Sequence, residues 1–217
     1  MITTTHILCL SLALAADPTV DTASEHIARG AQRFRDNDIA GSLRDFDRAV
    51  ELDPRSAPHL WQRGISHYYA GRYDDGRRQF ETHKAVNPHD VENATWHFIC
   101  VAKTNGLGAA RKTIIKIDAS RDTRVPMAEI YDFYIGRGSA DAVLKAAETA
   151  GTERARMYAH LYLGLYYEVA GDAENSKRHM RRSAAAKLEN DYMHDVARVH
   201  ILQRGWQDEP ATQKQRN

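Results

Sequence analysis

The chain has 217 residues, of which 27% are charged and 42% are hydrophobic, and its formal net charge at pH 7 is +1. This balance argues against a globally disordered chain and against the basic excess that nucleic-acid-binding proteins carry. The length suits one sizeable core or one short array of repeats. We therefore expect a folded protein with no nucleic-acid partner.

Residues 1–16 differ in composition from the rest of the chain. An apolar run begins at Ile7 and ends in Ala13-Leu14-Ala15-Ala16, which is typical of a secretory signal peptide cleaved near Ala15 or Ala16. The basic start of such a signal is weak here, so an uncleaved segment stays an alternative. The run is shorter than the roughly 20 apolar residues that cross a bilayer. We expect export, to a periplasmic or other extracytoplasmic compartment, without stable membrane insertion.

A period of 34 residues organises the chain after a polar lead-in over residues 17–22. Three residue types recur at this period: Gly30, Phe46 and Pro54, and again Gly64, Phe80 and Pro88. A glycine at the first position lets two helices approach closely, and a proline stops the second helix. One such helix pair cannot bury its apolar faces alone, so it must stack on copies of itself.

The predicted elements follow in pairs along the chain. Helices are expected over about 23–36 and 39–52 in the first unit, and the third unit breaks at Asn105-Gly106 before a second helix over 107–117. In chain order the units are repeats over 23–56, 57–90 and 91–120, a degenerate helical pair over 126–150, a further repeat over 153–187, a C-terminal capping helix over 190–204 and a frayed tail over 205–217. The fold class predicted from this order is all-α.

The unit 57–90 resembles the tetratricopeptide repeat. The residues that carry the resemblance are Leu60, Gly64, Tyr68, Gly71, Tyr73, Phe80 and Pro88. Arg63, Gly76 and His83 depart from the usual leucine or alanine. The resemblance extends over roughly 23–187, and the block from Tyr158 to Asp172 is similar to the last repeat of bacterial envelope adaptor lipoproteins of this fold. Their lipid-attachment cysteine has no match here.

This resemblance implies a right-handed α-solenoid that binds another protein and catalyses no reaction. First helices line the concave wall in this repeat type, and the peptide-binding candidates on that wall are Phe34, Trp61, Ile65, Tyr68, Tyr69 and Lys103. Soluble proteins seldom leave such a wall open, so either a partner's peptide or helix fills it or residues 126–150 do. The alternatives are that these aromatic residues are ordinary packing between helices, or that a second copy of the chain fills the groove.

A histidine and cysteine cluster is the alternative site of chemistry. Cys100 lies three residues after His97 on one helical face, and His67 could approach both from the neighbouring unit. No CxxC, HExxH or GxSxG motif accompanies these residues, and an apolar helix would raise the pKa of the thiol. We therefore expect a non-enzymatic scaffold with no catalytic residue, no metal and no cofactor, and we keep a metal-dependent or hydrolytic activity at this cluster as the alternative.

Overall fold

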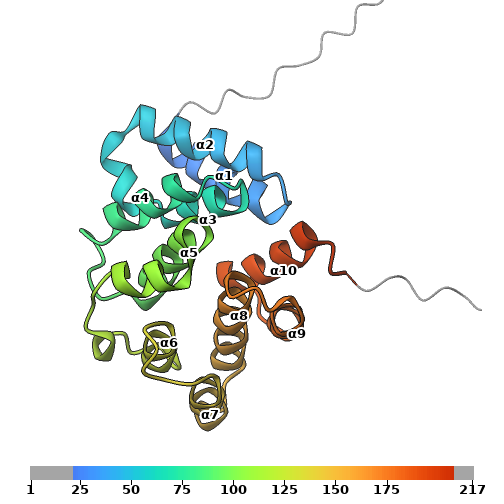
Figure 1. Ribbon diagram of the computed structural model, residues 1–217. Coiled ribbons are helices and arrows are strands. Elements are labelled where there is room, and N and C mark those ends of the chain that lie inside the picture. Colours follow the sequence, from blue (N-terminus) through green and yellow to red (C-terminus); the bar gives the residue numbers. More distant parts are fainter. Residues whose placement is uncertain (1–21, 208–217) are drawn as a thin grey trace, which may run out of the picture.

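The computed structural model describes residues 22–207, and this part of the chain is helical without strands (Figure 1). The signal peptide predicted over 1–16 and most of the predicted tail lie outside it. The helices are α1 (Ala23–Arg35), α2 (Ile39–Leu52), η1 (Pro54–His59), α3 (Trp61–Tyr69), α4 (Tyr73–His83), α5 (Val91–Thr113), η2 (Ala119–Arg121), α6 (Met127–Tyr134), α7 (Ala140–Ala150), α8 (Glu153–Val169), α9 (Ala173–Ala184) and α10 (Tyr192–Arg204).

Consecutive helices pack against each other as pairs, which confirms the paired all-helical architecture. Three of these pairs are α1 with α2, α3 with α4, and α8 with α9, and α4 also packs on α5 of the next unit. The same contact recurs in all three pairs: Gly30 against Phe46, Gly64 against Phe80 and Gly164 against Met180. A Cβ atom at Gly64 would lie 2.6 Å from the Phe80 ring. The recurring glycine therefore sets how closely the two helices of a pair approach.

The turn inside each of these pairs also repeats. The residue that leaves the first helix has a positive φ at Asn37 (65°), Gly71 (72°) and Gly171 (81°). This left-handed conformation favours glycine and asparagine. Two of the turns continue into an aspartate, Asp38 or Asp172, whose side chain accepts a hydrogen bond from the start of the second helix. These local interactions therefore define the same helical hairpin in several of the pairs.

Two boundaries differ from the sequence prediction. The unit 57–90 opens with the end of the 3-10 helix η1, which contains Pro58, and α3 begins only at Trp61. The break predicted at Gly106 is confirmed by its φ of 80° inside α5. The following helical segment ends at Thr113 rather than near residue 117, because Ile114 turns to an extended conformation with ψ of 139°.

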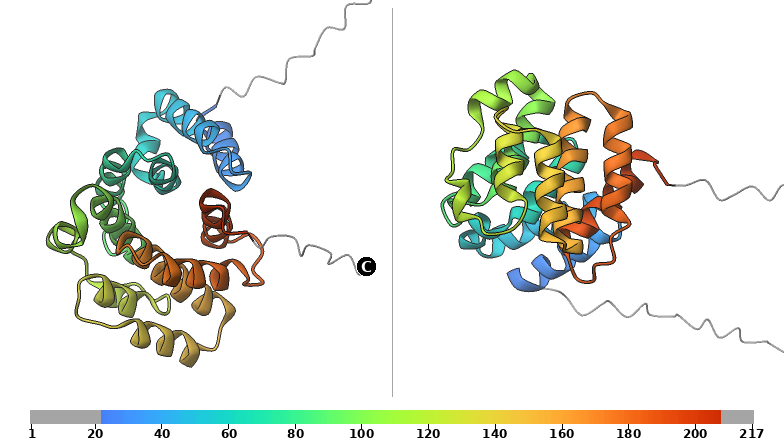
Figure 2. Two further views of the ribbon diagram at one scale, coloured as in Figure 1. Left: turned by 45° about the vertical axis from the view of Figure 1, so that its right-hand side comes forward. Right: turned by 90° about the horizontal axis from the view of Figure 1, so that it is seen from below.

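The helix array curves around α10. Figure 2 shows α10 inside the curve that the earlier helices form, between α1 and the last pair. It contacts α9, α8 and α1. Its packing is most extensive with α9, the last helix of the stack, as expected for a capping helix, and it also lies in the concavity next to α1. The alternative that residues 126–150 fill the concavity is wrong, because α6 and α7 pack on the outer side against α5 and α8.

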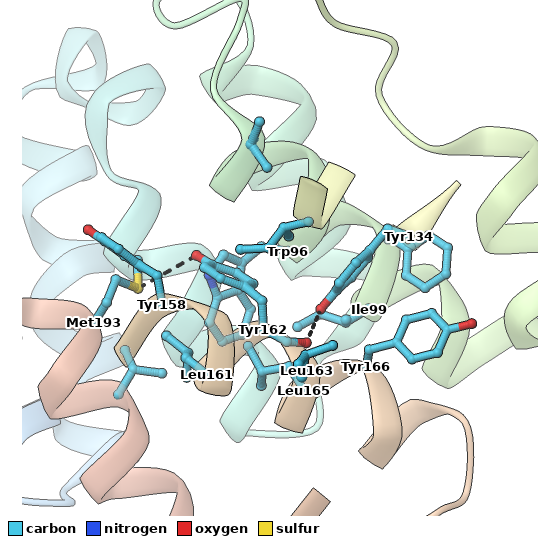
Figure 3. Close-up of a cluster of buried hydrophobic side chains, with 14 of the residues drawn as sticks. Trp96, Ile99, Tyr134, Tyr158, Leu161, Tyr162, Leu163, Leu165, Tyr166 and Met193 are labelled. Atoms are coloured by element: carbon cyan, nitrogen blue, oxygen red, sulfur yellow. Dashed lines mark hydrogen bonds between the residues drawn. The ribbon is translucent and has the colours of Figure 1, made fainter. Parts of the chain in front are cut away.

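A continuous apolar core joins these layers. Figure 3 shows α8 at its centre, with side chains from α5, α6 and α10 packed around it. The hydroxyl of Tyr134 donates to the carbonyl oxygen of Tyr162 at 2.8 Å, which ties α6 to α8. Among residues 22–207, none of the helices combines the length and apolar character needed to cross a bilayer.

Candidate functional site

The concave wall is built by α1, α3, α5 and α8, and its first contact with α10 is aromatic. The ring of Tyr192, at the start of α10, stacks on Phe34 with centroids 5.3 Å apart and meets Trp61 edge-on at 5.0 Å. The guanidinium of Arg35 lies 5.5 Å from the centre of the same Tyr192 ring. Aromatic pairs in these geometries add to the free energy gained from burial alone.

The other end of α10 meets the wall through Tyr69. The Tyr69 hydroxyl and His200 Nδ1 are 3.0 Å apart, and their rings lie edge-on at 5.8 Å. The guanidinium of Arg204 lies 5.8 Å from the centre of the Tyr69 ring. Burial lowers the pKa of His200 to about 4, so this imidazole is neutral at pH 7.

Glu168 of α8 is the polar centre of the concavity. Its carboxylate accepts hydrogen bonds from Arg204 Nε at 2.6 Å and from the Tyr68 hydroxyl, and Lys103 Nζ lies 3.4 Å away. Burial alone would raise the pKa of this carboxyl. The charge of His200 when protonated, the Arg204 guanidinium and the Tyr68 hydroxyl outweigh burial and bring the pKa to about 2. Glu168 therefore joins α3, α5, α8 and α10 as a carboxylate.

Polar contacts at the edge connect α10 to the first helix pair. Arg35 Nε lies 2.9 Å from Asp195 Oδ2, and the Gln203 side-chain amide donates to Asn37 Oδ1 at 2.7 Å. These contacts bridge the two ends of the described chain. Side-chain contacts between α10 and the first helix pair therefore close the curved array.

The structure places all six predicted binding residues on or directly behind this wall. Phe34, Ile65 and Tyr68 are fully buried, and Tyr69 is 8% exposed. Trp61 and Lys103 are half-buried. The wall is covered, as expected for a soluble protein, but by α10 and the Glu168 side chain rather than by residues 126–150. Whether the six residues also bind a partner stays a prediction.

Sequence reasoning missed the residues that approach this wall from α10. The set comprises Tyr192, Asp195, His200, Gln203 and Arg204. One signal was present in the sequence: the apolar residues of 190–204 are spread around the helix rather than gathered in one stripe. Met193, Val196 and Val199 are all buried. A helix that is apolar on several sides is typically enclosed by protein rather than laid over an open end.

The alternative histidine and cysteine cluster lies within the α3, α4 and α5 packing. A Cβ atom at Gly76 would lie 2.9 Å from Cys100 Sγ and 3.6 Å from His67 Cβ, while His97 Nε2 lies 3.3 Å from Glu81 Oε1. Burial raises the pKa of the Cys100 thiol and lowers the pKa of His67 to about 4. Over residues 22–207 no three His, Cys, Asp or Glu side chains converge as metal ligands would. The geometry therefore gives this alternative no support.

A search of the chain against models of known protein families finds no match. The resemblance to the tetratricopeptide repeat therefore depends on the residues quoted from the sequence. What the fold contributes independently is the paired helices, the recurring glycine contacts and the helix held in the concavity.

Proposed function

We propose that this protein is a non-enzymatic interaction scaffold that binds a helical segment of another protein in its concavity. The observation that carries the proposal is α10 itself, a helix seated there against Phe34, Trp61 and Tyr69. Recognition of a helix in a groove is a recurring mode of protein binding. Aromatic side chains suit it because they bury a large area with few rotatable bonds.

We extend the proposal to the repeat type and its hand. The 34-residue period, the recurring contact between a glycine and a large side chain, and the positive φ at each turn support a right-handed solenoid of the tetratricopeptide type. Among the helices that contact α10, α1 and α8 are first helices of their pairs, as the resemblance implies for an inner wall, and α9 is a second helix.

The compartment belongs to the same proposal. The sequence of residues 1–16 supports export, so the partner would be met outside the cytoplasm. Fractionation of cells that express the full chain tests this part. Recovery of the protein in the cytoplasmic fraction with residues 1–16 still attached would contradict it.

The binding experiment uses α10 as the probe. A labelled synthetic peptide of residues 190–207 is titrated into the full chain carrying Val196→Asp, which places a charge at a fully buried position of its own α10. We expect saturable binding to this variant, and binding at least about tenfold weaker to the unmodified chain, in which α10 competes. The control is the same peptide with Tyr192→Ala.

Circular dichroism makes this experiment decisive. The Val196→Asp chain must keep most of its helical signal. If it loses that signal, the full chain carrying the milder substitution Tyr192→Ala takes its place in the titration. A well-folded variant that does not bind the peptide would contradict the proposed function.

Self-association is the second candidate. The α10 helix of one copy could occupy the concavity of another through the same contacts that it makes here, because an exchanged element reuses its native interface. Sedimentation at two protein concentrations tests this candidate, and a monomer at both concentrations would exclude it over that range.

A further inference from the structure

The interface between α10 and the wall leaves buried polar atoms without partners. Five buried atoms there have no hydrogen-bond partner: Glu92 Oε1, Asn93 Oδ1, Trp96 Nε1, Tyr192 Oη and His200 Nε2. Elsewhere in residues 22–207 such atoms occur only on His67 and His97. A buried polar atom that lost its water partner and gained no other costs free energy. The wall is therefore an imperfect match for α10.

Three of these atoms belong to residues around one small cavity. Glu92, Asn93 and Trp96 of α5 line it, and Met193 of α10 lies at its boundary. Its volume is about 10 Å³, room for about one water-sized group. Asn93 Oδ1 is an acceptor, while Trp96 Nε1 carries a hydrogen and is a donor. The residues around the cavity thus leave one acceptor and one donor unpaired beside α10.

Met193 does not match these groups. Its thioether has no hydrogen to donate, and its sulfur is a weak acceptor. The only hydrogen bond recorded for this side chain within residues 22–207 is a long one, from the Tyr162 hydroxyl to Sδ at 3.9 Å (Figure 3). The side chain fills space beside the cavity and leaves its polar atoms unpaired.

Glu92 has partners of its own. Arg124 Nη1 lies 3.0 Å from Glu92 Oε1, and the same guanidinium is shared with Asp90 at 2.6 Å and Asp122 at 2.7 Å. Burial raises the pKa of Glu92 to about 8, against the opposing effects of Arg124 and of a hydrogen bond with Tyr158, so this carboxyl is mostly protonated at pH 7. The unpaired atoms that a helix could satisfy here are therefore those of Asn93 and Trp96.

We propose that the partner helix carries a glutamine where α10 has Met193, and that α10 is a cis competitor which this partner displaces. Glutamine has one more side-chain heavy atom than methionine, and the cavity has room for about one such group. Its amide supplies an N–H donor for Asn93 Oδ1 and an oxygen that accepts from Trp96 Nε1. Being neutral, it avoids the cost of burying a charge. This inference rests on the proposed function for the identity of the occupant.

The first test needs no partner. In the full chain, Met193→Gln should raise the melting temperature by about 2–4 °C, because the new amide satisfies atoms that methionine leaves unpaired. Met180→Gln is the matched control: Met180 is equally buried, packs on Gly164, and should lower the melting temperature. If both substitutions lower the melting temperature, or if Met193→Gln leaves it unchanged, the cavity does not favour an amide and the inference is wrong.

The second test separates this inference from the proposed function. Labelled peptides of residues 190–207 with Met193, Met193→Gln, Met193→Leu and Met193→Lys are titrated into the Val196→Asp chain. We expect the glutamine peptide to bind about tenfold more tightly than the methionine and leucine peptides. Equal binding of all four would overturn the inference and leave the scaffold function standing, and tightest binding by lysine would assign the site to a cation instead. Absence of binding by all four would overturn the function itself.

Discussion

The interfaces inside the helix pairs and the interface between α10 and the wall are built differently. Inside and between pairs, the contact of a glycine with a large side chain recurs and the buried hydroxyls are paired: Ser42 Oγ lies 2.9 Å from Ser66 Oγ, and Ser176 Oγ donates to the Gly164 carbonyl at 2.8 Å. At α10 the contacts occur once each, and several polar atoms lack partners. From this comparison we expect α10 to separate from the wall before the repeats unfold.

The largest expected effect comes from removing the charge at the centre of the α10 interface. Glu168→Gln keeps the shape of the side chain but leaves Arg204 and Lys103 without their counter-charge, so we expect a loss of about 3 kcal/mol in unfolding free energy. Hydrogen exchange measures where the loss falls, and it should be concentrated in α10. Equal loss of protection in α2 would show that α10 is not separable from the repeats.

Asp132→Asn is the matched control for that substitution. Its partner Arg137 is 71% exposed and Asp132 is 48% exposed, so this surface pair should contribute only about 0–1 kcal/mol. The difference between the two substitutions isolates the effect of burial on a carboxylate.

The next effect tests the repeat side of the comparison. Gly64→Ala places a Cβ atom 2.6 Å from the Phe80 ring, so we expect a loss of about 1–3 kcal/mol despite the better helix propensity of alanine. Gly108→Ala, also in a helix, meets no atom within 4 Å and should gain up to about 1 kcal/mol. Urea unfolding measures both. The same sign for both substitutions would remove close approach as the reason for the glycine.

The effect that is smallest at pH 7 is that of His200, which appears as a change in pH dependence. The pKa of His200 is about 4 in the folded chain, against an ordinary 6.5, so only the unfolded state takes up this proton between those values. Its contribution is fully present above pH 6.5 and is lost as the pH falls to about 4. His200→Asn keeps an acceptor for the Tyr69 hydroxyl, and it should flatten the dependence of unfolding free energy on pH by at most about 1.4 kcal/mol per unit. Identical slopes for parent and variant would contradict this.

The repeats could be predicted from the sequence because their determinants are local. Gly64, Gly71 and Phe80 act within one hairpin, so their spacing carries the information, and the helix predicted over 39–52 has the bounds of α2. The aromatic residues of the first helices were placed on the inner wall for the same reason. The position of each of these residues is determined by contacts with residues only a few helical turns away along the chain.

The position of α10 could not be predicted in this way. The contact between Arg35 and Asp195 joins residues 160 apart, and no spacing marks it. The partners of Glu168 come from three other helices and become neighbours only once the array has curved. The aromatic wall was therefore predicted, while the contacts that α10 makes with it were not.

The short connection between α9 and α10, residues 185–191, determines how strong a displacing partner must be. A segment tethered by so few residues is held near its binding surface at an effective concentration on the order of millimolar. A free partner at about 1 µM must therefore have an intrinsic affinity for the wall roughly a thousandfold greater than that of α10 to occupy half of the molecules. The short connection therefore sets a minimum affinity, and helical ligands that bind more weakly than this do not displace α10.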